Sequence, residues 1–371
     1  MIMTSNKGLK FSEDIYGKND YVDYMIYLFI TTAQKDFPEE IDVPNHAWDE
    51  YIDELYKYTG QNFIPKKNYT DCIRHTDIKK NDKKVVVGFS GGKDSTATSL
   101  YFKLNGKEVD LFHVKGLNRS YRHEDVASQD VASHLGLNLI DVNVKMTGKI
   151  LVNEGGSDNT VRYESPIKNE FILSLMIEHM MNEGISECAL GIFYNDGFET
   201  THRTNELSDV YKFNRSFEKA IQYTFPEFHL NVVFRNGVHS LAYIAYHDRE
   251  LINLYQSCMT RDMYRNNLRT LAENKYGITI PNNKCMSCYK CCAEYIILHS
   301  LGVISLDKKI IIDKLIPVLK KRVDKLSDSD IGSSDSLSMS ELLSIYMDLK
   351  SVQRYKKDLS LVDKDIAINE I

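Results

Sequence analysis

The feature that most constrains the fold is a short loop that joins an apolar run to a helical segment. Residues 85–89 (VVVGF) form a β-branched run that is typical of a buried parallel strand. The next residues read Ser-Gly-Gly-Lys-Asp-Ser, and residues 95–104 are predicted to be helical. Consecutive glycines allow a tight turn with no Cβ in the way of a ligand, and a helix N-terminus presents N–H groups that favour a phosphate. The order of strand, glycine-rich loop and helix therefore predicts a phosphate-binding loop.

Six consecutive residues are the predicted phosphate-binding residues: Ser90, Gly91, Gly92, Lys93, Asp94 and Ser95. The serines add hydroxyl donors, and Lys93 adds a point charge. A carboxylate beside a polyphosphate is reasonable where Mg²⁺ bridges the two, so Mg²⁺ is expected at Asp94. Lys93 and Asp94 are therefore the predicted catalytic residues. The segment has neither the spacing of a Walker A loop nor that of a dinucleotide fingerprint.

Strand and helix patterns alternate over the middle of the chain. Strands are predicted at residues 85–89, 109–114, 137–144, 187–192 and 230–234, and helices at residues 95–104, 124–135, 170–182 and 209–223. Such alternation implies right-handed crossovers and a parallel sheet covered on both faces. The predicted fold class is therefore α/β, with a nucleotide-binding architecture.

The chain is predicted to extend this domain at both ends. Within residues 47–58, Trp48, Tyr51, Ile52 and Leu55 lie on one face of an amphipathic helix. Residues 308–326 are predicted to be helical with a break at Pro317, followed by a Ser- and Asp-rich loop and a last helix over residues 340–355. The expected units are a helical N-terminal extension (1–80), an α/β domain that carries the phosphate-binding loop (81–257), a cysteine-rich module (258–303) and a helical C-terminal extension (304–371).

Composition sets the class of protein. The 371 residues carry 46 Lys and Arg against 52 Asp and Glu, a net charge of −6, and 43% are hydrophobic. This favours a globular chain and argues against one that coats nucleic acid by bulk charge. The longest apolar run, near residues 24–30, is far shorter than a membrane span needs, and residues 1–10 lack the apolar core of a secretory signal. We therefore expect a cytoplasmic protein without a membrane partner.

The seven cysteines are unevenly placed. Cys72, Cys188 and Cys258 are scattered, whereas the other four lie within eight residues: Cys285, Cys288, Cys291 and Cys292. In a reducing compartment such a cluster indicates metal binding or redox chemistry rather than disulfides. The two scattered cysteines at positions 72 and 188 are predicted to be core residues.

Residues 90–95 resemble the signature loop of the N-type ATP pyrophosphatases, the PP-loop family. They do so in the order of their residue types and in their position between a strand and a helix. The resemblance implies an adenine nucleotide alpha hydrolase-like fold with a parallel five-stranded sheet. It also implies cleavage of ATP to AMP and pyrophosphate. In that chemistry a substrate oxygen attacks the α-phosphorus while the loop holds the leaving pyrophosphate. A nucleophile then displaces AMP from the adenylated intermediate.

Four further matches resemble the 7-cyano-7-deazaguanine synthase branch of queuosine biosynthesis. They are Pro166-Ile167-Lys168-Asn169, Gly191 with Asp196, Asp209 with Phe213 and Phe217, and Glu124 at a helix start. The resemblance spans about residues 84–303. It implies ATP binding by Lys168 and Asn169, and substrate binding by Glu124, Asp196 and Asp209.

The same branch carries one cysteine, a gap and a Cys-x-x-Cys-x-x-Cys triplet that together bind one zinc ion. The resemblance therefore implies a structural Zn²⁺ held by four thiolates: Cys258, Cys285, Cys288 and Cys291. Cys292 is the alternative fourth ligand. Buried unliganded thiols and a redox-active or persulfide-carrying pair are the competing interpretations.

The leading functional hypothesis is ATP-dependent adenylation of a carboxylate, such as that of 7-carboxy-7-deazaguanine. Ammonia then displaces AMP to form an amide, and a second round gives a nitrile. Three departures from the branch leave the substrate open. Lys93 is more typical of thiolases, Lys168 stands where an arginine is usual, and 26 residues separate Cys258 from Cys285.

Two alternatives follow from these departures. The first is a tRNA thiolase or sulfurtransferase, which needs a reactive cysteine near the ATP site. The second is a component of an anti-phage defence or phage system that modifies a macromolecular partner. The terminal extensions would then dock a protein or nucleic acid; otherwise they shield surface or mediate self-association. The resemblance is consistent with a homodimer.

Overall fold

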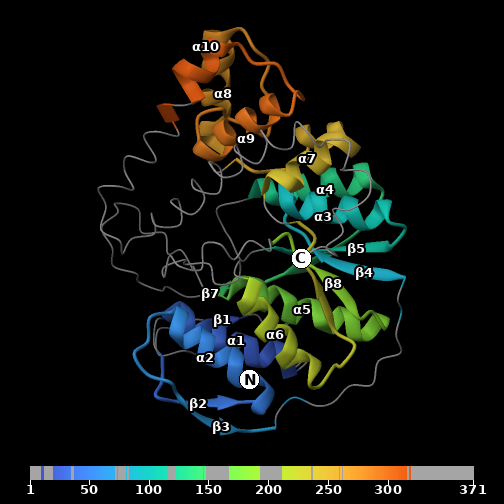
Figure 1. Ribbon diagram of the computed structural model, residues 1–371, viewed down its shortest axis with the longest axis vertical. Helices are drawn as coiled ribbons and strands as arrows, with labels where there is room; N and C mark the ends of the chain where they lie inside the picture. The colour runs from blue at the N-terminus through green and yellow to red at the C-terminus, as the bar shows by residue number, and fades with distance from the viewer. Residues whose placement is uncertain are drawn as a thin grey trace.

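The computed structural model describes residues 10–11, 20–34, 37–71, 73, 81, 83–115, 122–144, 146–147, 167–192, 211–234, 237–258, 260, 262–315 and 317–318. Its centre is a parallel sheet with the strand order β6-β5-β4-β8-β9 (Figure 1). The strands are β4 (Lys84–Gly88), β5 (Glu108–Lys115), β6 (Asn138–Asn143), β8 (Glu187–Ala189) and β9 (His229–Asn231). The predicted five-stranded parallel sheet is confirmed. Strands β8 and β9 are each shorter than the sequence pattern suggested.

Helices cover both faces of the sheet, as predicted. The helices α3 (Lys93–Leu104), α4 (Arg122–Leu135) and α7 (Gly237–His247) lie on one face, and α5 (Lys168–Glu183) and α6 (Tyr211–Gln222) lie on the other (Figure 1). Two buried hydrophobic clusters follow this division, one on each side of the strands. The helix α7 was not predicted.

The strand order changes direction at β4. Strand β4 pairs with β5 on one side and with β8 on the other, and every pair is parallel. In open parallel sheets of this kind, ligands bind beyond the carboxyl ends of the strands at such a switch point. The glycine-rich loop follows β4 directly, so the topology places it at the expected binding crevice.

The N-terminal segment shares a core with the sheet domain. It contains α1 (Asp20–Gln34), α2 (Asp49–Tyr58) and a small parallel pair of strands, β2 (Glu40–Val43) and β3 (Lys66–Tyr69), that the sequence did not predict. Tyr51 of α2 stacks on Phe213 of α6 with ring centroids 4.7 Å apart. Trp48, Tyr51, Ile52 and Leu55 are each at most 1% exposed. The predicted amphipathic face therefore completes the core on the α5–α6 side.

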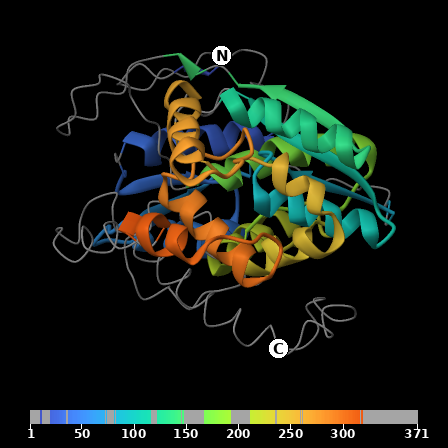
Figure 2. The same ribbon diagram turned by 90° about the horizontal axis from the view of Figure 1, so that it is seen from above.

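Three short helices form a separate group after the sheet domain. The helix α8 (Asp262–Tyr276) lies within the 26-residue interval between the first cysteine and the triplet, and α9 (Tyr289–Ser300) follows the triplet. Both pack with α10 (Lys308–Ile310) and its π-helical continuation η5 (Ile311–Leu315) around one small hydrophobic cluster (Figure 2). The predicted helix from residue 308 thus begins where expected. The loop and helix predicted over residues 327–355 lie outside the described residues.

A buried carboxylate joins three strands and a helix at the amino ends of the strands, opposite the ends where the loop lies. The side chain of Asp110 accepts hydrogen bonds from Lys84 Nζ (2.8 Å) and Asn138 Nδ2 (3.0 Å), and it pairs with His179 Nε2 (3.1 Å). Burial alone would raise the pKa of Asp110, but these partners outweigh it and hold the pKa below its usual 3.8. Its negative charge therefore stabilises the folded state.

Within the described residues, no helix is both long and apolar enough to cross a bilayer.

We expect Asp110→Asn to lower the free energy of unfolding at pH 7 by roughly 3 kcal/mol, because it leaves the Lys84 charge without its buried partner. The deficit should persist at all pH values above about 3.8 and shrink as the pH falls below that value, since protonated Asp110 resembles Asn. Urea titrations over a pH series measure this. Asp141→Asn, in a partly exposed pair with Lys115, is the control and should cost less than about 1 kcal/mol. A deficit for Asp110→Asn that does not change with pH would contradict the assignment.

Candidate functional site

The loop after β4 is shaped by its glycines. Gly91 has a φ of +68°, a conformation that disfavours other residues. A Cβ on Gly91 would lie 2.7 Å from the backbone nitrogen of Ser128 in α4, so the loop backbone packs directly on that helix. Gly92 is the N-cap of α3 and accepts the N–H of Thr96 at 3.0 Å. The strand, loop and helix arrangement predicted from the sequence is present.

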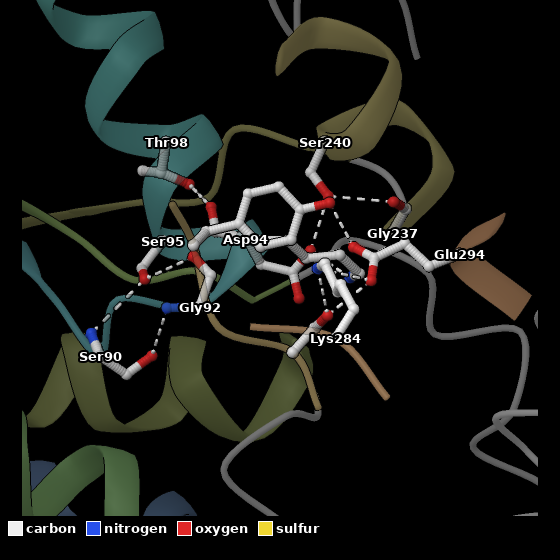
Figure 3. A network of polar contacts seen from close by, with 12 residues as sticks. Ser90, Gly92, Asp94, Ser95, Thr98, Gly237, Ser240, Lys284 and Glu294 are labelled. Carbon is white, nitrogen blue, oxygen red and sulfur yellow. Dashed lines mark hydrogen bonds and ion pairs between the residues drawn. The ribbon is translucent and has the colours of Figure 1, made fainter. Parts of the chain in front are cut away.

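The two loop serines have different positions. Ser95 is buried, and its hydroxyl donates to the carbonyl oxygen of Gly92 (3.2 Å) and accepts the N–H of Ser90 (3.4 Å) (Figure 3). Ser90 is exposed, and its Oγ accepts the N–H of Gly92 (3.4 Å). Ser95 therefore holds the shape of the loop, whereas Ser90 is accessible to a ligand.

Asp94 lies in the first turn of α3 between two donors. Lys93 Nζ is 2.5 Å and Ser240 Oγ is 2.6 Å from the same carboxylate oxygen (Figure 3). The Asp94 and Lys93 side chains are both about one quarter exposed, so they remain accessible. Ser240 comes from α7, a helix that the sequence analysis did not predict, and it is 146 residues away along the chain. No local pattern in the sequence pointed to it.

A second glycine brings the neighbouring strand end against this helix. A Cβ on Gly191, just after β8, would lie 2.5 Å from the backbone nitrogen of Ser95. Only a glycine therefore allows the β8 end to approach the first turn of α3. The match at Gly191 thus has a steric reason. Asp196 and Asp209, the predicted substrate residues that accompany this match, lie outside the described residues.

The other predicted substrate and nucleotide residues start two helices beside the loop. Glu124 lies in the first turn of α4, and Lys168 and Asn169 begin α5. Burial raises the pKa of Glu124, while the positive charges of Lys168 and Lys290 counter that rise. Lys168 therefore lies near enough to Glu124 for its charge to act on that carboxylate. The structure adds Lys290 from α9, which the sequence analysis did not single out.

A buried histidine connects the strand ends to α4 in the same region. The side chain of His113 on β5 contacts the carbonyl oxygen of Phe89 through Nδ1 (2.7 Å) and the carboxylate of Asp125 through Nε2 (2.9 Å). Its charge, when protonated, also acts on Glu124. His113 was missed because an isolated histidine in an apolar strand carries no motif.

Four cysteine sulfurs converge beside α9. The ligand atoms of Cys258, Cys285, Cys288 and Cys291 all lie within 4.8 Å of one another. A tetrahedral zinc ion with Zn–S bonds of about 2.3 Å would place its sulfurs about 3.8 Å apart. The sulfurs of Cys258 and Cys288 are 3.9 Å apart, which fits that geometry. The predicted cluster of four is therefore assembled, with Cys258 as its fourth member despite the long interval.

Backbone N–H groups support the cluster. The N–H groups of Ser287 and Cys288 point at the sulfur of Cys285 (3.3 and 3.2 Å), and the N–H of Cys291 points at Cys288 (3.5 Å). Hydrogen bonding with Cys258 lowers the pKa of Cys288 to about 7 and also lowers that of Cys285, whereas the hydrogen bonds within the cluster raise the pKa values of Cys258 and Cys291. Low thiol pKa values favour the thiolates that a metal ion requires.

The remaining described cysteines lie apart from the cluster. Cys292 is buried in the hydrophobic group of α8, α9 and α10, where its thiol faces the carbonyl oxygen of Met286 (3.7 Å). Cys188 is buried in β8, and burial raises its pKa well above the usual value. Cys292 therefore lies outside the four-sulfur cluster, and Cys188 is a core residue as predicted. Cys72 lies outside the described residues.

Comparison with known proteins agrees with this geometry. Residues 84–199 match the family model of the queuosine biosynthesis protein QueC. Over these residues the chain is QueC-like and of the PP-loop ATP pyrophosphatase type. The matched residues begin at β4 and include the loop, Glu124, Lys168 and Gly191. The zinc-type cluster and both terminal segments lie outside the matched stretch.

Two individual proteins are also similar. A GMP synthase (glutamine-hydrolyzing) from Alteromonas mediterranea is 27% identical over 143 residues, which are 38% of this chain and 27% of that protein. This chain thus spans about a quarter of its curated relative. A solved structure described as a predicted subunit of tRNA methyltransferase from Methanocaldococcus jannaschii is 17% identical. It matches 54% of this chain and 91% of its own, with a TM-score of 0.26. The fold assignment rests on the strand order rather than on that likeness.

The PP-loop geometry predicts different outcomes for its two glycines. Gly91→Ala should cost about 2 kcal/mol of stability and abolish nucleotide binding, because the backbone is left-handed and the Cβ meets Ser128. Gly92 has a φ of −80°, so Gly92→Val should leave the fold intact yet block binding, since its side chain occupies phosphate space. Thermal unfolding and equilibrium binding of Mg-ATP measure both. A Gly91→Ala protein with normal stability would contradict the packing described.

The cysteine cluster predicts one Zn²⁺ per chain. Cys288→Ser should lose the metal and yield a poorly folded protein, because a structural site contributes directly to folding energy. Cys292→Ser is the matched control, since its side chain packs in the same helical group but outside the cluster. It should keep the metal. Metal analysis of purified protein, together with thermal unfolding, tests both. Full zinc content in Cys288→Ser would overturn the ligand assignment.

Proposed function

We propose that this protein activates the carboxylate of a small acid with ATP, releases pyrophosphate and forms an acyl adenylate. A carboxylate oxygen attacks the α-phosphorus of ATP. The bond between the α-phosphorus and the oxygen that bridges to the β-phosphate breaks, and pyrophosphate leaves. Ammonia then attacks the acyl carbon and AMP leaves, which gives an amide. The amide oxygen then attacks the α-phosphorus of a second ATP with release of pyrophosphate, and loss of AMP together with the two amide protons gives a nitrile. The QueC match supports an acid like 7-carboxy-7-deazaguanine as the substrate.

The observation that carries the proposal is the position of the loop relative to Asp94. The loop lies at the N-terminus of α3 beyond the carboxyl end of β4, where a helix dipole and free N–H groups favour pyrophosphate. The Asp94 carboxylate is fixed beside it by Ser240 and Lys93. A carboxylate oxygen suits Mg²⁺, so Asp94 would hold the ion, which would neutralise the charge of the leaving pyrophosphate. The chain's own groups bind and orient the phosphates.

An acidic substrate is supported by the charges at the edge of this site. Lys168 and Lys290 act on Glu124 from two different helices, so cationic side chains gather here although the whole chain has a net charge of −6. The Glu124 carboxylate can accept hydrogen bonds from N–H groups of the same substrate. A small molecule that carries both a carboxylate and ring N–H groups fits this pairing.

Ammonia as the second substrate is supported by the relative that shares this domain. That GMP synthase is described as glutamine-hydrolyzing. Glutamine hydrolysis releases ammonia, which is the nucleophile that the proposed second step needs. We propose free ammonia, or ammonia delivered by another protein, as the nucleophile for this chain.

The thiolase alternative is less well supported by the described residues. That reaction needs a reactive cysteine near the ATP site. Among the described cysteines, four converge in the cluster, and Cys188 and Cys292 are buried in apolar surroundings with raised pKa values. Rapid alkylation of a single cysteine in the zinc-loaded protein, suppressed by Mg-ATP, would favour the thiolase.

The N-terminal segment is proposed to act as part of the enzyme. Its buried aromatic residues stack on α6, as with Tyr51 on Phe213, and Phe29 of α1 packs on Phe171 of α5 at 5.2 Å. A segment that completes the core beside the α5 start supports the active site rather than serving only to dock a macromolecule.

The products of ATP turnover test the proposed reaction. With Mg²⁺, ammonia and the candidate acid, we expect AMP and pyrophosphate in equal amounts, because the loop holds the β- and γ-phosphates as one leaving group. Separation of nucleotides by chromatography, with a pyrophosphate assay, measures this. ADP as the main product would contradict the proposal.

Asp94→Ala should lower this turnover by about a thousandfold or more while leaving the melting temperature close to wild type, because the carboxylate is not part of the core. Asp248→Ala is the matched control, since among the described residues its carboxylate pairs with the partly exposed His134, and it lies just past the end of α7 that is opposite to Ser240. It should keep full activity. Near-normal turnover in Asp94→Ala would refute the role of this carboxylate.

A further inference from the structure

One segment connects the phosphate loop with the cysteine cluster. Residues 255–258 follow the short helix η4 (Arg249–Asn253) and end at the cluster residue Cys258. Three of these residues are buried, and each makes a contact with a different part of the site. We refer to residues 255–258 as the linking segment.

The first contact is with the loop backbone. The N–H of Gln256 donates to the carbonyl oxygen of Gly91 at 2.7 Å. The opposite side of Gly91 lies against Ser128, so the Gly91 peptide is held between α4 and the linking segment. A glycine has no side chain to restrain it, and its position therefore depends on such backbone partners.

The second contact is with a buried ion pair. Lys284 and Glu294 are 1% and 3% exposed, and Lys284 Nζ is 2.8 Å from Glu294 Oε2. Tyr255 donates its hydroxyl to Glu294 Oε1, and Ser257 Oγ donates to Glu294 Oε2 at 2.5 Å. Figure 3 shows Lys284 and Glu294 close to Asp94 and Ser240. Lys284 Nζ also lies 3.9 Å from the centre of the Tyr255 ring. Every oxygen of this buried carboxylate thus binds the linking segment or Lys284.

The third contact is with the metal-type cluster. Lys284 immediately precedes Cys285, and Glu294 lies three residues after Cys291 on α9. The side-chain amide of Gln256 donates to the carbonyl oxygen of Cys258 at 2.8 Å. The ion pair and the cluster therefore share one short piece of chain, so the arrangement of the cysteines fixes where Glu294 and Lys284 lie.

We propose that the linking segment positions the phosphate loop in response to the state of the four-cysteine site, with Glu294 and Tyr255 as positioning residues. A bound metal fixes the cysteines, which fix Lys284 and Glu294. These in turn hold Tyr255 and the N–H of Gln256 against Gly91. The proposal assigns the cluster a role in nucleotide binding in addition to its role in stability, and it rests on the proposed function only for the identity of the nucleotide.

The physical reason is the cost of ordering the loop. A glycine loop that is already fixed binds phosphate without losing further backbone entropy, whereas a loosened one must be ordered by the ligand. Burial and Glu294 raise the pKa of Tyr255, and Tyr255 also lies close enough to Asp94 for the Asp94 charge to add to that rise. A displaced linking segment would therefore disturb both the backbone and the carboxylate that face the phosphates.

Hydrogen exchange tests the coupling without any nucleotide. We would compare the zinc-loaded full chain with protein stripped by a chelator, at a temperature where circular dichroism shows both to be folded. Exchange should quicken in the peptides that contain Gly91 and Gln256. It should stay unchanged in the peptide of β6, which lies at the far edge of the sheet. Unchanged exchange at Gln256 after verified loss of zinc would overturn the proposal.

Tyr255→Phe provides a second test in which the metal stays bound. It removes only the hydroxyl that donates to Glu294 and keeps the ring. The dissociation constant for α,β-methylene-ATP with Mg²⁺ should rise roughly tenfold, as for loss of one hydrogen bond to a charged group, while zinc content stays at one per chain. Tyr56→Phe is the control, because its buried hydroxyl donates to Pro38 in the N-terminal core, and it should bind like wild type.

The outcomes separate this proposal from the proposed function. Equal affinity in Tyr255→Phe and Tyr56→Phe would overturn the coupling, even where the wild type binds the analogue tightly. A wild type that fails to bind the analogue would instead count against the proposed function, while the exchange comparison would still decide the coupling. Equal loss of affinity in both variants would show a general effect of stability and would also refute the positioning role.

Discussion

The close approach of backbone to backbone around Gly91 is the constraint on which the rest of the site depends. The loop is held by the backbone of α4 at Ser128 on one side and by the N–H of Gln256 on the other. The end of β8 meets the first turn of α3 through Gly191. The contacts of Gly91 with Ser128 and of Gly191 with Ser95 leave no room for a Cβ. The site is therefore built mainly from peptide groups, which suit phosphate oxygens, and few side chains are needed beyond Asp94, Lys93 and Ser240.

The surrounding layers keep this arrangement rigid. Strand β4 is buried between two neighbours, and a hydrophobic cluster lies on each face of the sheet. The N-terminal helices complete the hydrophobic cluster on the α5–α6 side of the sheet. The helix α5, which starts with Lys168 and Asn169, therefore packs against them. The three-helix group at the other end holds the cysteines. The loop thus lies between the N-terminal helices and the three-helix group, which are distant from each other in sequence.

Much of the architecture could be predicted, because the spacing of apolar residues along a segment indicates whether it is a strand or a helix and which face is buried. The run of residues 85–89 and the loop after it predicted the strand, the turn and the helix that the structure contains. The cluster of four cysteines followed from the triplet and the family resemblance. Helix α7 was missed because residues 237–247 are apolar on most sides and show no clear period. Ser240, His113 and Glu294 could not be found, because each acquires its role only through residues brought near by the fold.

The central claim, that an oxygen of the acid attacks ATP, can be tested with an isotope. The candidate acid is prepared with ¹⁸O in its carboxylate and turned over with unlabelled Mg-ATP and ammonia, and the AMP is analysed by mass spectrometry. If the carboxylate attacks the α-phosphorus, the AMP must carry one ¹⁸O atom from the acid. Unlabelled AMP would show that water or another nucleophile attacks instead, and it would contradict the account.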